Sequence, residues 1–374
     1  MNNIQKLAQL GQSIWYDNIS RGLIKSGELK RMVEEGLRGV TSNPTIFDKA
    51  ISGSHDYDDQ IRELVEKNPN IDAAEIIKEL MITDIQMACD VLKPVYDVTK
   101  GLDGYVSVEV TPHKAKDTQA TIEEVRELWG KINRKNLMVK IPATKEGLPA
   151  IEEMIYEGRN INVTLIFSVE RYRAVASAYI AGIERRAKEG KPVDHVASVA
   201  SVFVSRIDTL VDELLAKKDQ NMYKSLMGKA AVANTKMVYQ AFKEIFNTLR
   251  FKALGANNAR VQRPLWGSTG TKNPAYNDLL YVETLMGPNT VNTVPPQTYA
   301  AILDHCKPAL TIESDLDGAR SVLEDIPAAG IDMKWVMQKL EDDGVAAFAK
   351  SFDALYANVQ KKRGEFVHAS VPTE

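Results

Sequence analysis

The sequence predicts an α/β protein built as a (β/α)8 TIM barrel, with an N-terminal helix, helical insertions and a helical C-terminal extension. Three observations support this prediction. Short β-like runs alternate with amphipathic helical runs along the 374 residues, eight β-like runs can be counted, and no GxGxxG motif opens a helix after the first of them. An open, doubly wound sheet shares the alternation, but the missing glycine motif makes it the less favoured alternative.

The eight β-like runs are short and rich in β-branched and aromatic residues, as is typical of buried strands. They are "SIWYD" (13–17), "RGVTSNP" (38–44), "GYVSVEV" (104–110), "LMVKIPA" (137–143), "INVTLIFS" (161–168), "HVASVASVFVSR" (195–206), "ARVQRPLWGST" (259–269) and "TVNTVPP" (290–296). Eight parallel strands are the number that a closed barrel of this type requires.

Apolar residues at helical spacing predict helices between the strands. The pattern occurs in residues 72–93, 121–132, 169–189 and 275–287. Asp72 and Glu75 stand where they can cap the first of these helices.

The chain is longer than the ~250 residues of a typical barrel core. The surplus lies in residues 45–98, in paired helices over 207–252, and in a helical part from about residue 308 onward. We expect residues 1–374 to form a single barrel domain that carries this C-terminal extension.

Composition argues against several classes of protein. Hydrophobic residues make up 44% and charged residues 26%, and the formal net charge of −3 lacks the basic excess of a nucleic-acid binder. Cys89 and Cys306 lie far apart, which argues against a disulfide framework and fits a reducing cytosol. The five histidines are scattered and form no HExxH motif, so no metal site is expected.

The N-terminal segment 1–13 has no apolar core of the kind that signal peptides contain. No run reaches the ~20 apolar residues that a membrane-spanning helix needs. We therefore expect a cytoplasmic protein without a membrane partner, and the sequence leaves a monomer and a homodimer equally open.

In barrels of this type the chemistry takes place at the C-terminal ends of the strands, so polar residues there are candidates. Six stand out, namely Asp17, Asn43, Glu109, Lys140, Thr164 and Arg206. Three of them have ordinary structural explanations: Asp17 as a helix cap or turn residue, Asn43 before proline as a turn signal, and Thr164 as a common strand residue.

Glu109 and Lys140 are harder to explain as structure, because both are charged and flanked by apolar residues on a strand. A buried structural ion pair remains an alternative. A lysine kept dry by its apolar neighbours suits imine formation with a carbonyl substrate, since only the neutral amine attacks and burial disfavours the ammonium. Bond cleavage beside the imine needs a base, and loss of water needs a proton shuttle. Asp17 and Glu109 can divide these two roles.

Two long motifs resemble the signatures of the transaldolase family, class I Schiff-base enzymes of the pentose phosphate pathway. "GVTSNPTIF" (39–47) is similar to the first, and "LMVKIPATKEGLPAIEEM" (137–154) is similar to the second, which is centred on the imine-forming lysine. "WYD", "VSVEV", "NVTLIFS", "SVFVSR" and "PLWGSTGTK" follow in the family's order, over at least residues 13–296. The run "YVETLMGPNTVNTVPP" (281–296) resembles the longer subfamily, whose members have about this length.

The resemblance implies a role for each candidate. Lys140 would form the Schiff base with a ketose phosphate, and Asp17 would take the proton from the substrate hydroxyl during carbon–carbon cleavage. Glu109 and Thr164 would hold and activate the water that shuttles protons. Asn43 and Ser201 would bind hydroxyls of the dihydroxyacetone unit, and Arg206 would bind the phosphate with its planar fork of donors.

In the family, a serine and an arginine after the seventh strand also contact the phosphate. Here that place reads "GSTGTK", with Ser268 present and no arginine at the expected spacing. Either Lys272 supplies the missing charge, or the backbone amides of Gly267 and Gly270 contribute instead. The alternative for Lys272 is that it belongs to a flexible loop. Phe203 stands where a tyrosine would favour direct fructose 6-phosphate aldolase chemistry, so Phe203 together with Glu109 supports transfer over simple cleavage.

The implied reaction moves a dihydroxyacetone unit from sedoheptulose 7-phosphate or fructose 6-phosphate to glyceraldehyde 3-phosphate or erythrose 4-phosphate, in the non-oxidative pentose phosphate pathway. Its partners are small sugar phosphates, and it requires no metal and no organic cofactor. Two alternatives are a class I fructose-6-phosphate aldolase that releases free dihydroxyacetone, and a phosphosugar-binding barrel without catalysis.

Overall fold

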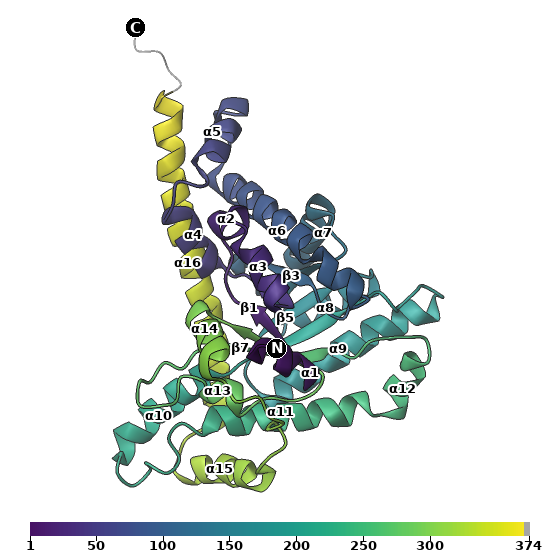
Figure 1. Cartoon of the computed structure of the whole chain (residues 1–374), viewed down its shortest axis with the longest axis vertical. Helices are drawn as coiled ribbons and strands as arrows, with labels where there is room; N and C mark the ends of the chain where they lie inside the picture. Colours follow the sequence, from purple (N-terminus) through teal and green to yellow (C-terminus); the bar gives the residue numbers. More distant parts are fainter. Residues whose placement is uncertain (370–374) are drawn as a thin grey trace.

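Eight parallel strands, each hydrogen-bonded to the next in chain order, close into a barrel when β8 pairs with β1 (Figure 1). This computed structural model describes residues 1–369. The strands are β1 (Gln12–Tyr16), β2 (Gly39–Thr41), β3 (Tyr105–Glu109), β4 (Leu137–Pro142), β5 (Ile161–Ile166), β6 (Ser198–Phe203), β7 (Arg263–Gly267) and β8 (Thr290–Val294). The predicted barrel is confirmed, and the open sheet is excluded.

Helices cover the outside of the barrel. They are α1 (Asn3–Gln9), α2 (Arg21–Lys25), α3 (Glu28–Glu35), α4 (Pro44–Ser52), α5 (Asp58–Lys67), α6 (Ala73–Val98), α7 (Thr118–Ile132), α8 (Gly147–Tyr156), α9 (Val169–Lys188), α10 (Ser205–Asp219), α11 (Ala230–Phe246), α12 (Leu249–Gly255), α13 (Leu280–Glu283), α14 (Pro296–His305), α15 (Leu316–Ala328) and α16 (Met333–Ala369), with a short 3-10 helix η1 (Pro112–Lys114). The N-terminal helix, the helical insertions and the helical C-terminal part are therefore all present.

All eight strands end one to three residues earlier than the sequence suggested, and the difference is largest, three residues, in β2 and β6, because helices begin there. β2 ends at Thr41, since Asn43 caps α4 and Pro44 occupies its first turn. β6 ends at Phe203, and Arg206 lies in the first turn of α10 rather than at the end of a strand. Both corrections move a polar side chain from a strand end to a helix start.

The predicted helix over 275–287 is wrong, since only α13 is helical in that segment. Its side chains bond elsewhere: Asn277 accepts from the Leu279 N–H, which favours a turn over a continuing helix. The hydroxyls of Tyr276 and Tyr281 donate to Asp212 and Asp208 of α10, each at 2.7 Å. These tertiary contacts hold the segment against α10.

The N-terminal end of the barrel is closed by a buried polar network and an apolar layer. Arg263 Nη1 lies 3.0 Å from Asp103 Oδ1, and the Asp103 carboxylate also accepts from Ser13 Oγ at 2.7 Å and Trp15 Nε1 at 3.2 Å. Next to this network lies a cluster of buried side chains: Trp15, Tyr105, Met138, Ala197, Val199, Leu265 and Val291. The N-terminal end of the barrel is thus filled by these side chains.

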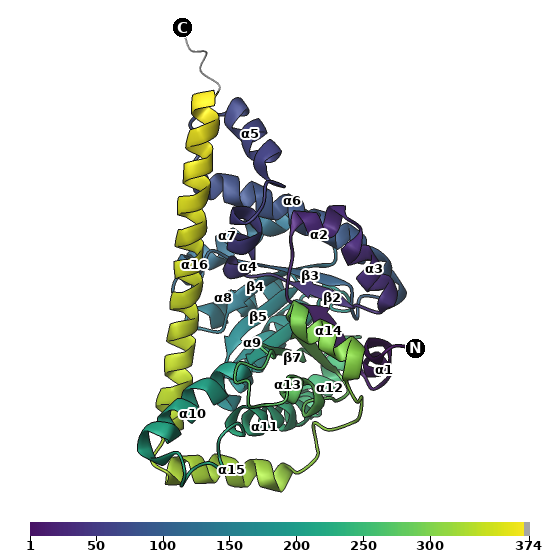
Figure 2. The ribbon, with the colours of Figure 1, turned by 60° about the vertical axis from the view of Figure 1, so that its left-hand side comes forward.

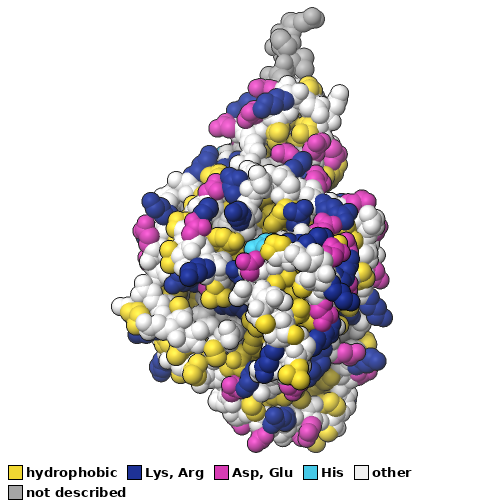
Figure 3. All heavy atoms as spheres, turned by 90° about the vertical axis from the view of Figure 1, so that its right-hand side faces the viewer, with side chains coloured by type: hydrophobic (Ala, Val, Ile, Leu, Met, Phe, Trp, Pro, Cys, Tyr) yellow, Lys and Arg dark blue, Asp and Glu magenta, His cyan; other side chains and the backbone are white. Residues whose placement is uncertain are grey.

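The C-terminal helix α16 runs along one side of the molecule, where it packs against α4, α5, α6 and α10 (Figure 2). Among the helices of residues 1–369, none combines the length and apolar character that crossing a membrane requires. On the face shown in Figure 3, basic, acidic and apolar side chains are interspersed. Cys89 and Cys306 are buried and form no disulfide.

Candidate active site

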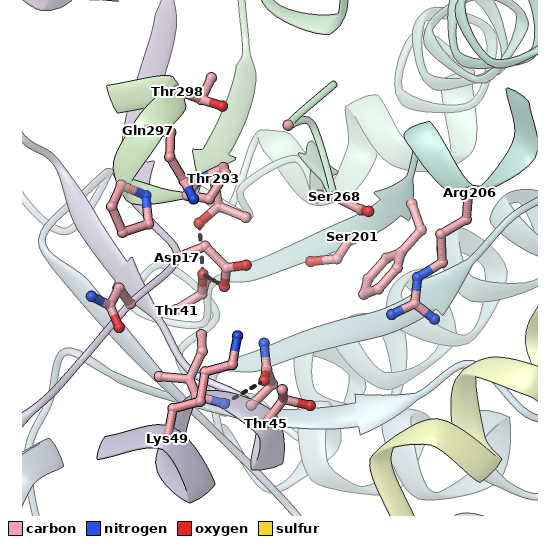
Figure 4. A pocket seen from close by; sticks show the side chains of 18 of the residues that line it. Asp17, Thr41, Thr45, Lys49, Ser201, Arg206, Ser268, Thr293, Gln297 and Thr298 are labelled. Carbon is pink, nitrogen blue, oxygen red and sulfur yellow. Dashed lines mark hydrogen bonds between the residues drawn. The ribbon is translucent and has the colours of Figure 1, made fainter. Parts of the chain in front are cut away.

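A cavity of about 800 Å³ lies at the C-terminal ends of the strands (Figure 4). Eight of the ten sequence-predicted site residues line it: Asp17, Asn43, Lys140, Ser201, Phe203, Arg206, Ser268 and Lys272. The other two, Glu109 and Thr164, are buried and do not line this cavity, although Glu109 pairs with Lys140, which does. The barrel thus gathers residues from five strands and the loops that follow them into one region.

Lys140 projects from β4 into the barrel and is almost completely buried, with 4% of its surface exposed. Its Nζ lies 3.2 Å from Glu109 Oε2 and donates a hydrogen bond to the Ser42 carbonyl at 3.0 Å. Glu109 sits opposite Lys140 in the β3–β4 register, so the pairing of the two strands fixes this contact.

The expected apolar sheath around the amine is wrong, because side chains alternate along a strand. Val139 and Ile141 pack in the hydrophobic core shared with the surrounding helices, whereas Met138 lies in the cluster inside the barrel. Val139 and Ile141, the immediate neighbours of Lys140, thus face away from its Nζ. What surrounds the amine is a carboxylate and a backbone carbonyl, enclosed by the barrel.

Asp17 follows β1 directly, and its side chain is held by hydroxyls. Its Oδ1 accepts from Thr41 Oγ1 at 2.7 Å, and Thr41 Oγ1 lies 2.6 Å from Thr293 Oγ1 (Figure 4). Burial raises the pKa of Asp17, while the charges of Lys140 and Lys272 and the Thr41 hydrogen bond counteract this rise. Ser20, not Asp17, caps the next helix α2, so the explanation of Asp17 as a helix cap is wrong.

Asn43 combines a structural contact with a free donor. Its Oδ1 accepts from the Ile46 N–H at 3.0 Å, which makes it the N-cap of α4. Its Nδ2 has no hydrogen-bond partner among the described residues, although Asn43 lines the cavity. The capping bond therefore fixes the side chain, and the amide donor is left for a ligand.

Glu109 and Thr164 present buried oxygens without hydrogen-bond partners. Glu109 Oε2 forms an ion pair with Lys140 Nζ but has no hydrogen-bond partner in the described chain. Thr164 Oγ1 is fully buried and also has no partner there. Unsatisfied buried oxygens usually mark a site for an ordered water. Burial raises the pKa of Glu109, and the neighbouring Lys140 counteracts this rise. Each of these two oxygens can therefore accept a hydrogen bond from a water, and Glu109 Oε2 lies beside Lys140.

A chain of hydrogen bonds, which sequence reasoning missed, supports Ser201. Ser201 Oγ donates to Asn162 Oδ1 at 2.6 Å, and Asn162 Nδ2 donates to Ser107 Oγ at 3.0 Å. Asn162 and Ser107 precede Thr164 and Glu109 by two residues on their strands, so they share the inward face. Extending the alternation backwards from each candidate would have found both.

Arg206 lies on the other side of the cavity from Asp17 and is partly buried (Figure 4). Its guanidinium makes no hydrogen bond and no ion pair within the described chain, but lies over the rings of Phe203 and Phe348, 5.3 Å and 5.9 Å from their centroids. Burial lowers the pKa of this guanidinium. An unpaired arginine in the first turn of a helix is a good site for an anion.

Ser268 lies beside this region, with its Oγ 2.9 Å from Ser205 Oγ. Lys272 is exposed at the cavity rim and has no ion-pair partner among the described residues. Sequence reasoning missed Thr41, Thr293 and Phe348, which also line the cavity. Within residues 1–369, His, Cys, Asp and Glu side chains form no group of three or more that could hold a metal ion.

A model of the protein family described as "Transaldolase/Fructose-6-phosphate aldolase" matches residues 14–359 of this chain. The chain is 47% identical to "Transaldolase" from Trichodesmium erythraeum, over 96% of this chain and 97% of that protein. It is 46% identical to "Transaldolase 2" from Nostoc punctiforme, over 96% and 97% of the two chains. It is also 45% identical to "Transaldolase" from Thermobifida fusca, over 96% and 98%.

Proposed function

This chain belongs to the transaldolase/fructose-6-phosphate aldolase family and is a transferase of the transaldolase type, and we propose that Lys140 carries its chemistry as a Schiff base. The observation that carries this proposal is the position of Lys140 Nζ, enclosed by the barrel and 3.2 Å from a carboxylate. Lys140 lines a cavity that is also lined by Asp17 and by Arg206, which has no ion-pair partner in the described chain.

The first step is imine formation at C2 of a ketose phosphate. Glu109 accepts a proton from the Lys140 ammonium, and the neutral amine attacks the carbonyl carbon. The C2 oxygen takes one proton from the newly bonded nitrogen and a second from Glu109, through a water held against Thr164, and then leaves as water to give the protonated imine. The unsatisfied oxygens of Glu109 and Thr164 support this assignment.

The second step is cleavage of the bond between C3 and C4. The Asp17 carboxylate takes the proton of the C4 hydroxyl, an aldose phosphate leaves, and the bonding electrons pass into the imine to give an enamine. The hydrogen bond from Thr41 holds Asp17 in place. The raised pKa makes Asp17 a stronger base than an ordinary carboxylate. A second aldose phosphate then captures the enamine by the reverse of these events.

The remaining candidates bind the substrate. The Ser201 hydroxyl donates its hydrogen bond to Asn162 Oδ1, so the lone pairs of Ser201 Oγ accept a hydrogen bond from a hydroxyl of the dihydroxyacetone unit. Asn43, whose Oδ1 is held by the Ile46 N–H, donates a hydrogen bond from Nδ2 to a hydroxyl of the same unit. Arg206 and Ser268 bind the phosphate, and Lys272 adds a positive charge at the rim.

The substrates that we infer are sedoheptulose 7-phosphate or fructose 6-phosphate as donor and glyceraldehyde 3-phosphate or erythrose 4-phosphate as acceptor, in the cytosolic pentose phosphate pathway. Release of free dihydroxyacetone is not favoured, since the relatives are named transaldolase and Phe203 offers no hydroxyl in the cavity. If cleavage of fructose 6-phosphate were independent of erythrose 4-phosphate, the aldolase would be the better assignment.

Borohydride trapping tests the Schiff base directly. Reduction in the presence of fructose 6-phosphate should leave a stable adduct on Lys140, located by mass spectrometry of the digested protein. Lys140→Ala should abolish both the adduct and turnover. Lys145, five residues further on and exposed, provides the matched control, because Lys145→Ala should retain both. Absence of an adduct on Lys140 in an active enzyme would refute the proposal.

A further inference from the structure

Arg206 is held by aromatic rings from two distant parts of the chain. Phe203 comes from the end of β6, directly before the helix that carries Arg206, whereas Phe348 comes from α16. Phe348 itself is buried, with 5% of its surface exposed, and lines the cavity. Without a hydrogen bond or ion pair in the described chain, the guanidinium takes its orientation from these two ring faces.

α16 approaches Arg206 closely because residue 344 is a glycine. A Cβ at this position would lie 2.8 Å from Leu165 Cδ2 and 3.6 Å from Arg206 Nη1. Glycine is disfavoured inside helices, so its presence in the middle of α16 needs a reason, and close packing supplies one. Phe348 follows Gly344 by four residues and therefore lies on the same face of the helix.

Polar contacts on the same face fix the register of α16 against the barrel. Arg171 Nε lies 3.1 Å from Glu341 Oε2, and Thr45 Oγ1 lies 2.8 Å from Ser351 Oγ. Glu341 and Ser351 precede and follow the Gly344–Phe348 pair by three residues each. The ring of Phe348 is thus placed by contacts on either side of it along the helix.

The carboxylate of α16 that acts on Arg206 is engaged elsewhere. Asp343 influences the pKa of Arg206 through its charge, but its Oδ2 lies 2.8 Å from Lys339 Nζ of the same helix. The charge of Glu109 acts on Arg206 more strongly than that of Asp343, but Glu109 pairs with Lys140 at 3.2 Å, so both carboxylates have other partners when an anion arrives. Contact with two rings restricts the orientation of the guanidinium, which preorganises its donors for the oxygens of a phosphate.

We propose that Phe348 is a positioning residue which acts through Arg206 and gives the enzyme part of its preference for phosphorylated over unphosphorylated sugars. This inference rests on the proposed role of Arg206 as the phosphate ligand. It assigns to the C-terminal helix a direct part in substrate selection.

The test compares Phe348→Ala, Phe348→Leu, Arg206→Ala and the double variant. With fructose 6-phosphate and erythrose 4-phosphate, Phe348→Ala should raise both KM values about tenfold and leave kcat within about twofold. Phe348→Leu, which keeps most of the apolar volume without the ring, should give a smaller rise and covers the case in which the alanine variant does not fold. In the Arg206→Ala background, Phe348→Ala should have no further effect.

Borohydride trapping on Lys140 distinguishes the contribution of the phosphate to binding from the contribution of the rest of the sugar. The concentration of fructose 6-phosphate that gives half-maximal borohydride adduct should rise in Phe348→Ala, while that of unphosphorylated fructose should not change. Phe366→Ala provides the control, since this phenylalanine lies 18 residues further along α16, ~27 Å away at 1.5 Å per residue. It should behave as the parent enzyme.

The outcomes distinguish this inference from the proposed function. If Arg206→Ala abolishes the preference for fructose 6-phosphate and the Phe348 variants keep it, the inference is wrong and the phosphate role stands. Equal losses for fructose and fructose 6-phosphate, or a fall in kcat alone, would show a general structural effect and also overturn the inference. If Arg206→Ala itself leaves the preference intact, the proposed phosphate role is wrong.

Discussion

Asp17→Asn separates the two chemical steps proposed for this enzyme. The change keeps an oxygen that can accept from Thr41 Oγ1, a contact of 2.7 Å, so the shape of the site is preserved. What is lost is the ability to take a proton from the C4 hydroxyl. A positioned general base contributes 10²–10⁴-fold, so we expect kcat to fall ~10³-fold, equivalent to ~4 kcal/mol in the barrier to cleavage.

Two measurements on the same protein test this expectation. Turnover of fructose 6-phosphate with erythrose 4-phosphate should be almost lost, whereas the borohydride adduct on Lys140 should still form, because Glu109 and Thr164 serve imine formation. Asp278 also lines the cavity, but its carboxylate pairs with His305 at 3.2 Å, so Asp278→Asn is a matched control that should retain activity. A kcat for Asp17→Asn within about tenfold of the parent would refute the role as base.

Three further predictions concern stability. Burial raises the pKa of Asp208 from its ordinary value near 3.8 to about 6, so the unfolded chain ionises first and this carboxyl lowers the free energy of unfolding by ~2 kcal/mol as the pH rises from 4 to 7.5. Asp208→Asn should remove that slope in urea titrations at the two pH values, and parallel curves for both proteins would contradict it. Asp103→Ala leaves Arg263 buried without its partner and should destabilise the protein by ~3–5 kcal/mol in the same assay, with an unchanged midpoint as the contrary result. Gly344→Ala forces a Cβ against Leu165 and should lower Tm, at a cost of ~1–3 kcal/mol, whereas Gly130→Ala, with open space around it on α7, should not.

The fold could be predicted from the sequence because its signals are local. The alternation of strands and helices, and their number, follow from side-chain periodicity within each segment. Segment 275–287 shows where this fails. Its apolar spacing is helical, but Tyr276 and Tyr281 bond to α10, and a contact between segments far apart in the chain has no local signature.

In the candidate site, too, some residues have a local sequence signal and some contacts have none. Glu109 and Lys140 stand out in the sequence because charged residues are unexpected among apolar residues on a strand, and the structure pairs the two and brings Lys140 to the cavity. The helical character of α16 was also predictable. That its residue 348 would reach Arg206 was not, because the apolar face of a helix does not reveal which surface it covers.

The surroundings of Lys140 also change how its reactivity is understood. An apolar sheath would favour the neutral amine, but the proposed reaction also passes through a protonated imine, which such a sheath would destabilise. A carboxylate 3.2 Å away serves both states, since Glu109 can take the proton from the ammonium and then face the positive imine. In the cleavage step the positive imine and the negative Asp17 disappear together, as one becomes an enamine and the other a neutral acid. Burial favours a step that removes a pair of charges, so the desolvation that raises the pKa of Asp17 also favours cleavage.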